Sequence, residues 1–270
     1  MAMANKKLVL LSALLFCTIA SAEDANTSST ADGNMTLLLG PSVVVLDKPY
    51  KGKDAEVFPY PAAIFIYDRF YFAIDTAGYR LLANQRTAAP APGTTLLYLD
   101  AIAKWRSDGY DSSDSDALRG MHDRHGTVDA GGEFGVAGDW GSVTTSLVTD
   151  ALDQHDGQEV RITYGKRFSD AFNVKDLKLT PSVGLAWQSN NLVNYYYGVR
   201  PGEARPGRPA YRPGEAVNWL AGLDGTYQLN DKWALFAGIT IFWLDDEIRN
   251  SPIVSRDYAV SFIGGAMYKF

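Results

Sequence analysis

The stretch that most constrains the fold is the C-terminal one, Ala216 to Phe270, where apolar and polar side chains alternate with a period of two. This period is typical of β-strands, because successive side chains of a strand point to opposite faces of the sheet. The alternation falls into three segments, the first two of them separated by a turn at Asn230-Asp231. In the middle segment, every second residue from Trp233 to Trp243 is apolar. The pattern therefore predicts three successive strands, each with one apolar face.

Aromatic residues stand at both ends of these apolar faces. Trp233 and Trp243 lie ten residues apart on one face, and so do Tyr258 and Tyr268. Ten residues of strand rise about 33 Å, and a tilt of about 40° reduces this to about 25 Å, the height of the lipid-facing band of an outer-membrane barrel. A soluble β-sandwich explains one such strand, but three in succession favour a barrel with two interfacial aromatic girdles. The predicted girdle residues are Trp219, Tyr227, Trp233, Trp243, Tyr258 and Tyr268.

The N-terminus has the pattern of a secretory signal peptide. Lys6-Lys7 precede the apolar stretch Leu8–Ala20, which is too short to span a bilayer, and Ala20-Ser21-Ala22 has the form of a cleavage site. We expect cleavage after Ala22, a flexible periplasmic lead-in over residues 23–34, and an outer-membrane barrel over residues 35–270. The one cysteine, Cys17, lies within the signal, so the mature chain has no thiol chemistry.

Charge and hydropathy narrow the class further. The formal net charge is −6, and removal of Lys6 and Lys7 makes it two units more negative. This acidity argues against nucleic acid as a partner, because phosphate backbones attract basic surfaces. No run of about 18 apolar residues follows the signal, which excludes a transmembrane helix. The mean hydropathy of −0.13 fits a membrane protein in which lipid-facing and lumen-facing residues alternate.

The strand count is settled by parity. Eleven strand-like segments are visible, yet a bacterial barrel has an even number with both ends in the periplasm. A short additional strand near Tyr79 to Gln85 restores the parity. We therefore predict an all-β antiparallel transmembrane β-barrel of about 12 strands, with 10 and 14 as the alternatives. The other predicted strands are Met35–Leu46, Val57–Tyr67, Phe70–Asp75, Thr95–Trp105, Val128–Ala137, Ser142–Ala151, Val160–Phe168 and Leu177–Gln188.

Some segments do not read as regular strands. Pro59 and Pro61 are awkward inside a sheet and indicate a rim position or a bulge. Arg106 to Gly126 reads as a long polar loop, and Asn190 to Glu215, rich in Pro, Gly and Arg, reads as a large irregular loop. We expect both loops on the outer side of the membrane, with only short turns in the periplasm.

Charged residues at the polar positions of the alternating pattern are expected to face a hydrated lumen. They either form a lattice that fills the lumen or line a small pore. Because a twelve-stranded barrel is narrower than a porin, we expect a packed or partly filled lumen. The predicted lumen-facing residues are Asp129, Glu133, Arg161, Arg167, Lys178 and Asp224.

No motif for catalysis stands out. The sequence has neither a G-x-S-x-G nor an H-E-x-x-H pattern. The three histidines fall in predicted loops, with His122 and His125 beside Asp123, and His155 beside Asp156. Such residues are usually solvated surface groups, and a metal site at this spacing on an irregular loop is weakly supported. We therefore predict no catalytic, cofactor or metal site.

Several short motifs follow one another along the mature chain, among them Y-K-G at 50–52, P-Y-P at 59–61, L-R-G-M at 118–121, V-D-A-G-G at 128–132, Y-Y-G-V at 196–199, L-D-D-E-I at 244–248 and S-P-I-V at 251–254. In this order they resemble the MipA/OmpV family of outer-membrane proteins, and the resemblance covers essentially all of the mature chain. The positions that carry it are Tyr50, Gly52, Tyr197, Gly198, Glu247, Ser251 and Pro252.

The resemblance implies a non-enzymatic β-barrel without cofactors, surrounded by the lipid and lipopolysaccharide of the Gram-negative outer membrane. It also implies a scaffold that bridges the lytic transglycosylase MltA and a bifunctional murein synthase during peptidoglycan remodelling. A narrow pore for small solutes and a surface-loop adhesin are the alternatives within the family. The C-terminal Tyr268 and Phe270 resemble the signal that the barrel-assembly machinery reads by strand addition.

Overall fold

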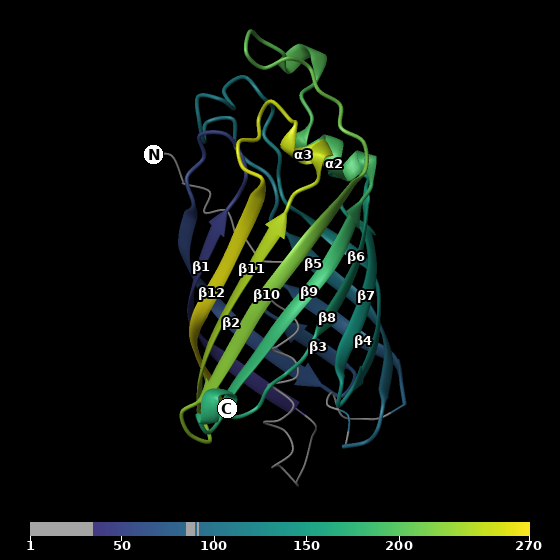
Figure 1. Ribbon diagram of the computed structural model, residues 1–270, viewed down its shortest axis with the longest axis vertical. Helices are drawn as coiled ribbons and strands as arrows, with labels where there is room; N and C mark the ends of the chain where they lie inside the picture. The colour runs from purple at the N-terminus through teal and green to yellow at the C-terminus, as the bar shows by residue number, and fades with distance from the viewer. Residues whose placement is uncertain (1–34, 85–89, 91) are drawn as a thin grey trace.

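The protein, described by a computed structural model over residues 35–84, 90 and 92–270, is a closed antiparallel β-barrel (Figure 1). Each strand pairs with its neighbours in sequence, and β1 pairs with β12 to close the ring. The predicted fold class and strand number are therefore confirmed. The twelve strands are β1 (Met35–Asp47), β2 (Glu56–Tyr67), β3 (Phe70–Ala73), β4 (Thr76–Ala83), β5 (Leu96–Arg106), β6 (Thr127–Gly138), β7 (Gly141–Asp150), β8 (Gln158–Gly165), β9 (Leu177–Gln188), β10 (Ala216–Gln228), β11 (Trp233–Trp243) and β12 (Tyr258–Lys269).

The predicted signal peptide, its cleavage site after Ala22 and the lead-in to residue 34 lie outside the described residues. Within the part of the chain that the structure describes, no helix is both long enough and apolar enough to cross a membrane.

Alternation along the strands separates an outer face from an inner one. In β11 the side chain of Ile239 is 39% exposed, whereas that of the next residue, Thr240, is 3% exposed. In β10 the same contrast holds between Leu223, which is exposed, and Asp224, which is buried. The outer face is therefore the apolar one, as a lipid-covered barrel requires.

The strand register places the six aromatic residues of the predicted girdles at the two ends of the barrel. At the outer end, Trp243 pairs with Trp219 on one side and with Tyr258 on the other. At the periplasmic end, Trp233 pairs with Tyr268, and their ring centroids are 5.1 Å apart. Tyr227 lies at this same end, opposite Leu235 of β11. These positions are the ones that two interfacial belts would occupy.

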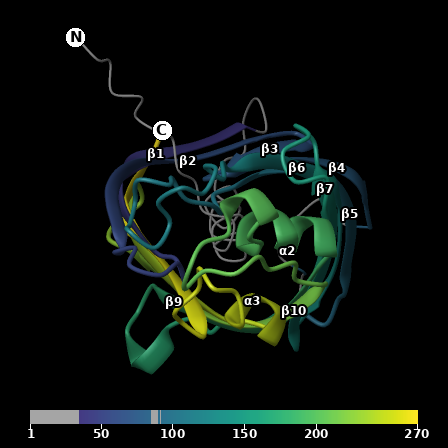
Figure 2. The same ribbon diagram turned by 90° about the horizontal axis from the view of Figure 1, so that it is seen from above.

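The outer connections contain most of the helical structure. The helix α2 (Asn190–Tyr197) lies across the barrel opening in Figure 2, followed by the short helix η2 (Pro201–Glu203), and α3 (Asp246–Arg249) lies at the edge of the opening. The segment Asn190 to Glu215 was predicted to be irregular throughout. This prediction was wrong for its first residues, which form α2. Leu192, Val193, Tyr196 and Tyr197 are buried on one face of α2, and their spacing is that of an amphipathic helix.

The hairpin of β3 and β4 is much shorter than its neighbours. β3 has four residues, and the chain turns back at Ile74 and Asp75, where Ile74 has a φ of 57°. On one side the hairpin reaches Lys104, close to the outer end of β5. On the other side it pairs with β2 only from Ile64 onward. The outer part of β2, Glu56–Ala62, is therefore paired with β1 alone among the strands that the structure describes.

Pro59 and Pro61 lie on this unpaired edge. The β1–β2 register runs through both prolines without a shift, so they mark no bulge. Ala63 directs its carbonyl toward the short hairpin, where it accepts the N–H of Ile74 at 2.9 Å. Because alternate residues of an antiparallel strand direct their backbone groups to the same side, the two proline nitrogens also point to the unpaired side. A missing N–H costs no ladder hydrogen bond there.

Two clusters of buried apolar side chains stabilise the described fold. One lies on the inner wall formed by β1, β2 and β12, and includes Leu38, Ile64 and Ile263. The second lies among the outer connections and includes Tyr50 and Tyr196. The outer connections are thus packed against one another rather than extended into solvent.

Candidate functional site

A network of buried charges crosses the lumen just below the outer end of the barrel. At its centre is Glu159 of β8, which is almost completely buried. Its carboxylate accepts from Lys104 at 3.3 Å, from Arg106 at 3.1 Å and lies 2.9 Å from the guanidinium of Arg161. The amide of Gln188 donates to it at 3.1 Å. These charge-assisted hydrogen bonds link β5, β8 and β9.

Arg106 extends the network to the next strand. Its Nε donates to Asp129 of β6 at 2.7 Å, and its Nη1 donates to Asp108 at 2.9 Å. With Glu159, three carboxylates share one guanidinium, whose rigid fork suits such multiple contacts. Buried ion pairs of this kind add little net stability, but they fix geometry, and removal of one partner is costly.

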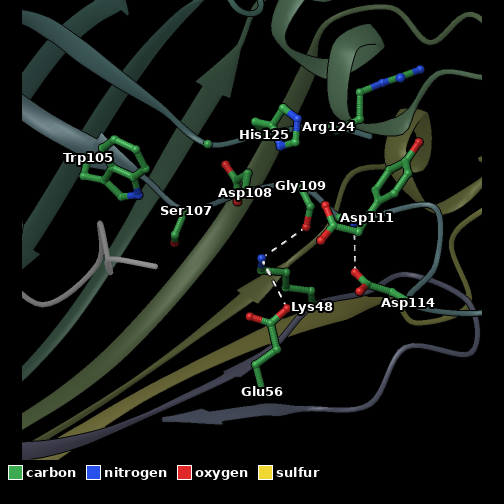
Figure 3. A pocket seen from close by; sticks show the side chains of 12 residues that line it. Lys48, Glu56, Trp105, Ser107, Asp108, Gly109, Asp111, Asp114, Arg124 and His125 are labelled. Atoms are coloured by element: carbon green, nitrogen blue, oxygen red, sulfur yellow. Dashed lines mark hydrogen bonds and ion pairs between the residues drawn. The ribbon is translucent and has the colours of Figure 1, made fainter. Parts of the chain in front are cut away.

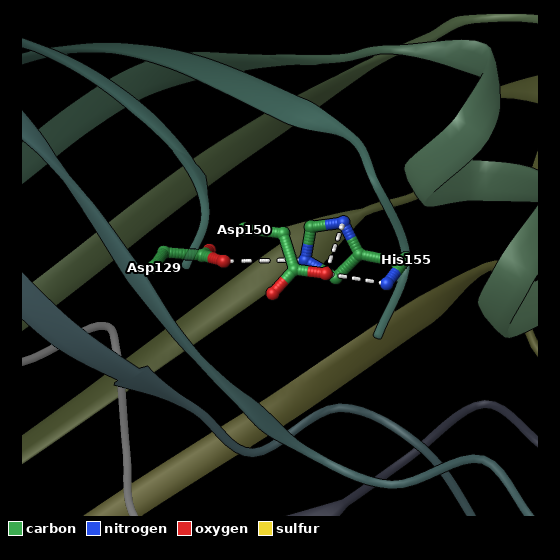
Figure 4. A group of neighbouring side chains, drawn as sticks. All are labelled: Asp129, Asp150 and His155. Atoms are coloured by element: carbon green, nitrogen blue, oxygen red, sulfur yellow. Dashed lines mark hydrogen bonds and ion pairs between the residues drawn. The ribbon is translucent and has the colours of Figure 1, made fainter. Parts of the chain in front are cut away.

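Asp129, Asp150 and His155 are close enough together to suggest a metal or acid–base site (Figure 4). The His155 Nε2 lies 3.2 Å from Asp129, and its Nδ1 accepts the N–H of Gly157 at 2.9 Å, so the proton is on Nε2. Asp150 accepts N–H groups of His155, Asp156 and Leu152 and the hydroxyl of Thr127.

Each of these ligand atoms is therefore already used in a hydrogen bond, and the imidazole of His155 is fully buried. The rings of Tyr195 and Tyr196 lie 6.3 Å and 5.8 Å from it. The arrangement fits a hydrogen-bonded strut that anchors the 151–157 connection better than it fits a metal or catalytic centre.

The structure brings only some of the predicted lumen-facing charges together. Asp129 and Arg161 belong to the network around Glu159. Glu133 and Asp224 line a smaller cavity of about 60 Å³ that also touches Arg161. Lys178 is half-buried in β9, and Arg167 lies beyond the end of β8, in the connection to β9.

The outer connections form a cap over this network. Tyr50 from the β1–β2 connection packs its ring against Tyr110 at 4.7 Å and stacks on Tyr197 at 5.7 Å. The hydroxyl of Ser251 donates to the carbonyl of Tyr197 at 2.6 Å. Four connections that are distant in sequence therefore meet in one buried aromatic cluster. The apolar members of the cap are Tyr50, Tyr110, Leu118, Met121, Leu192, Val193, Tyr196, Tyr197, Val199, Ala216, Leu244, Ile248, Ile253 and Val254.

The motif positions singled out in the sequence gather in this cap. Gly52 has a φ of +73°, which side chains rarely adopt. A Cβ on Gly198 would lie 2.4 Å from the carbonyl oxygen of Asn194, so no larger residue fits at that helix end. Glu247 accepts the N–H of Gly214 at 2.7 Å. Pro252 follows Ser251 in the connection to β12 and is half-buried. These residues all lie in the connections that form the cap.

A charge clamp joins two of the cap connections. Arg124 donates to both carboxylate oxygens of Glu203 at 3.0 Å, and the backbone N–H of His122 donates to the same carboxylate at 2.9 Å. Burial alone would raise the pKa of Glu203, but hydrogen bonds from the backbone of His122 and Arg200 and from the side chains of His122 and Arg124 lower its pKa to about 2. His122, which was expected to be a solvated loop residue, also contacts η2 through its imidazole Nδ1, 2.8 Å from Glu203.

Arginines of the Asn190–Glu215 segment brace the cap as well. Arg205 and Arg208 donate to backbone carbonyls of the 107–126 connection, at Asp116, Ala117 and Arg119. These donors are therefore used within the protein, where they join the Asn190–Glu215 segment to the 107–126 connection.

The β8–β9 connection at the periplasmic end, residues 166–176, is longer than the short turns expected there. It contains the short helix η1 (Ala171–Asn173) and projects from the lower end of the barrel, outside the ring of strands (Figures 1 and 2). Phe172 in this helix is 85% exposed, the most exposed large apolar residue in the described chain. Asp170, Phe172, Asn173 and Asp176 all have positive φ, a conformation that Asp and Asn adopt readily but that is unusual for Phe.

Sequence reasoning missed the centre of the buried network. It placed Arg106 in a loop and began the eighth strand after Glu159, and Lys104 was not singled out. The overlooked signal is the alternation in β5, where every second residue is buried and Asp100, Ile102 and Lys104 share the inward face. A charged side chain at an inward-facing, buried position of a strand needs a partner of opposite charge across the lumen.

Comparisons with known proteins point to one family. The model of the family "MltA-interacting protein MipA" matches residues 39–270. The MltA-interacting protein of Escherichia coli K12 is 28% identical over 249 residues, which is 91% of this chain and 95% of that protein. Outer membrane protein OmpV of Vibrio cholerae is 32% identical over 160 residues, 58% of this chain and 59% of the relative. Among solved structures, OmpT of Vibrio cholerae aligns with a TM-score of 0.35 and 9% identity, over 90% of this chain and 99% of that one.

Proposed function

The chain belongs to the MltA-interacting protein MipA family, and from this premise we propose that it is a non-enzymatic scaffold that docks a lytic transglycosylase at the periplasmic end of the barrel. The protein is an outer-membrane β-barrel, so a partner that works on peptidoglycan meets it from the periplasm. A bifunctional murein synthase is the second partner in this proposal, held on the same side. Outer-membrane lipid and lipopolysaccharide surround the barrel, and the assembly machinery recognises the C-terminal Tyr268 and Phe270.

The observation that carries the proposal is Phe172 on the projecting connection 166–176. An aromatic side chain that is 85% exposed on a residue with a positive φ is costly to maintain in an isolated protein. Aromatic anchors of this kind dominate the binding energy of protein–protein interfaces. The position at the periplasmic end is where a transglycosylase would make contact.

The packed cap favours a scaffold function rather than a pore function. The aromatic cluster and the network around Glu159 occupy the outer end of the barrel, where an open channel would need water. The same packing weighs against an adhesin built on a free outer loop, because one face of α2 is buried in the cap. The Asp129–His155 pair is buried and hydrogen-bonded within the protein.

Site-specific photocross-linking in cells tests the proposal. A photoreactive phenylalanine analogue at position 172 should cross-link to a lytic transglycosylase. The same analogue at Leu152, an exposed residue of an outer connection, is the matched control and should give no such product. A transglycosylase adduct absent at position 172, or equally abundant at position 152, would overturn the proposal.

A further inference from the structure

The cavity of about 60 Å³ in the lumen borders the network around Glu159. One buried water needs roughly 10–15 Å³, so this cavity has room for a small ion with a few waters but not for a drug-sized solute. We call it the inner cavity. Much of its lining is oxygen, from the hydroxyls of Thr76, Thr144, Ser146, Thr163, Ser182 and Thr240 and from the carboxylates of Glu133 and Asp224.

The two cations that line the inner cavity are both paired with Glu159. Lys104 lies 3.3 Å and Arg161 lies 2.9 Å from its carboxylate. No ion pair among the described residues reaches Asp224. The other ion pairs between strands of the inner wall are Arg106 with Asp129 and Arg80 with Asp100.

Asp224 is a buried carboxylate without a partner. It is 6% exposed and lines the inner cavity, and it accepts no hydrogen bond within the part of the chain that the structure describes. The other lining carboxylate, Glu133, accepts the hydroxyl of Tyr98 at 3.4 Å. A buried carboxylate that lacks both a counter-charge and a donor is costly, so Asp224 needs either a proton or a cation from solution.

Two hydroxyls converge beside Asp224 over a residue that has no side chain. Gly222 lies two positions before Asp224 on the same inward face, and it pairs with Ser182 of β9 and Thr240 of β11. A Cβ on Gly222 would lie 2.7 Å from Ser182 Oγ and 3.4 Å from Thr240 Oγ1. Both oxygens therefore border the space over Gly222, and neither has a hydrogen-bond partner among the described residues.

A larger cavity, of about 420 Å³, lies among the outer connections and differs in its charges (Figure 3). Each carboxylate that lines it already has a partner. Its charges are therefore balanced within the protein, and it lacks the feature that singles out the inner cavity. The ion pairs are Lys48 with Glu56, Lys53 with Asp114, and Arg106 with Asp108.

We propose that the inner cavity binds an alkali-metal cation of the size of sodium, with the Asp224 carboxylate as its charged ligand and the hydroxyls of Ser182 and Thr240 as neutral ligands. Carboxylate and hydroxyl oxygens are hard donors, which suit such ions better than transition metals. A single carboxylate balances one positive charge, whereas calcium takes six to eight oxygen ligands with carboxylates among them. This site lies within the lumen, away from Phe172, and does not depend on the scaffold proposal.

The experiment compares urea unfolding of the full-length mature barrel in lipid vesicles in two salts. One is sodium chloride at about 150 mM, and the other is N-methyl-D-glucamine chloride at the same concentration, whose cation is too large for the inner cavity. Equal ionic strength keeps the screening of other charges the same. We expect sodium to lower the unfolding equilibrium constant about tenfold, which corresponds to a Kd of about a tenth of the sodium concentration.

Asp224→Asn removes the charge with little change of shape, and its unfolding should be the same in the two salts. Gly222→Ala keeps the charge but fills the space between Ser182 and Thr240, so it should lose the sodium effect as well. The matched control is Gly132→Ala, whose Cβ would meet no atom nearer than 3.6 Å outside its chain neighbours. This control should respond to sodium like the wild type.

Equal unfolding of the wild type in the two salts would assign a proton to Asp224 and overturn the proposal. A sodium effect that persists in Asp224→Asn would also overturn it, because the ion would then bind elsewhere. An undiminished effect in Gly222→Ala would contradict the assigned hydroxyl ligands. If Gly222→Ala does not fold, the comparison of Asp224→Asn with the wild type still decides.

Discussion

Tyr50 stacks on Tyr197 with ring centroids 5.7 Å apart, although one comes from the connection after β1 and the other from the end of α2. The Tyr50 hydroxyl also reaches the carbonyl of Tyr196 at 3.5 Å. Burial and the neighbouring tyrosines raise the pKa of Tyr50 well above its usual value, so it stays neutral at physiological pH. This contact fastens the first outer connection to the fifth, and it makes the cap one packed unit.

Tyr50→Ala should loosen the cap without unfolding the barrel. Truncation of a buried aromatic residue costs about 3–5 kcal/mol, and here the loss falls on the outer connections. Protease added to intact cells should cut the variant in these connections at least ten times faster than the wild type. The same truncation at Tyr258, which is exposed on the outer face, should leave the rate unchanged. Equal cutting of Tyr50→Ala and wild type would contradict a cap held by this cluster.

Arg106→Ala should destabilise the protein far more than Arg119→Ala. Loss of Arg106 leaves the buried carboxylates of Asp129 and Glu159 with fewer partners, and such losses cost about 3–5 kcal/mol. Arg119 pairs with Asp116 at the surface, where a pair contributes about 0–1 kcal/mol. Urea unfolding in detergent measures both free energies. Similar values for the two variants would show that the network is not structurally important.

Acid should open the cap through Glu203. Its pKa is about 2 in the folded protein against an ordinary 4.5, so its contribution to stability is present above pH 4.5 and is lost as the pH falls toward 2. Protease cutting of the outer connections should therefore increase over this window. The protease should cut the Glu203→Gln variant faster than the wild type at pH 7. Its cutting rate should also increase less as the pH falls. If the cutting rate of Glu203→Gln changed with pH as that of the wild type does, other carboxylates would be responsible for the effect.

Paired arginine substitutions test the two faces of β11. Ile239→Arg places a charge on the lipid-facing side and should cost about 2–4 kcal/mol near the middle of the bilayer. Thr240→Arg points inward, beside the small cavity that holds Asp224, and should cost much less. The free energy of unfolding in lipid vesicles gives both values. Equal costs would contradict the assigned faces.

Much of the barrel was predictable because period-two alternation is local. The last three strands were predicted from alternating residues alone, and their aromatic residues lie toward the two ends of the strands. The short hairpin was harder. Its first strand was predicted directly, as Phe70–Asp75, and β3 spans Phe70–Ala73. Its second strand followed only from the need for an even strand count, which is a global constraint, and it was expected near Tyr79 to Gln85 whereas β4 spans Thr76–Ala83.

The cap was not predictable to the same depth. Tyr50, Tyr197 and Ser251 stood out as motif positions, but nothing local says that they meet, because their contacts join connections far apart in sequence. The unpaired outer edge of β2 had one signal, the pair Pro59 and Pro61, which indicated an irregular edge without showing which neighbour was missing. Glu159 was overlooked because its role depends on Lys104 and Arg106 from another strand.

The central claim is that the periplasmic end of this barrel docks a lytic transglycosylase through Phe172. The direct measurement is the affinity of a purified lytic transglycosylase for the barrel in nanodiscs, for the wild type and for Phe172→Asp, at low and moderate salt. The account predicts saturable binding to the wild type and at least tenfold weaker binding to Phe172→Asp, with Leu152→Asp unchanged. No binding to the wild type at low salt, or equal affinity for Phe172→Asp, would contradict it.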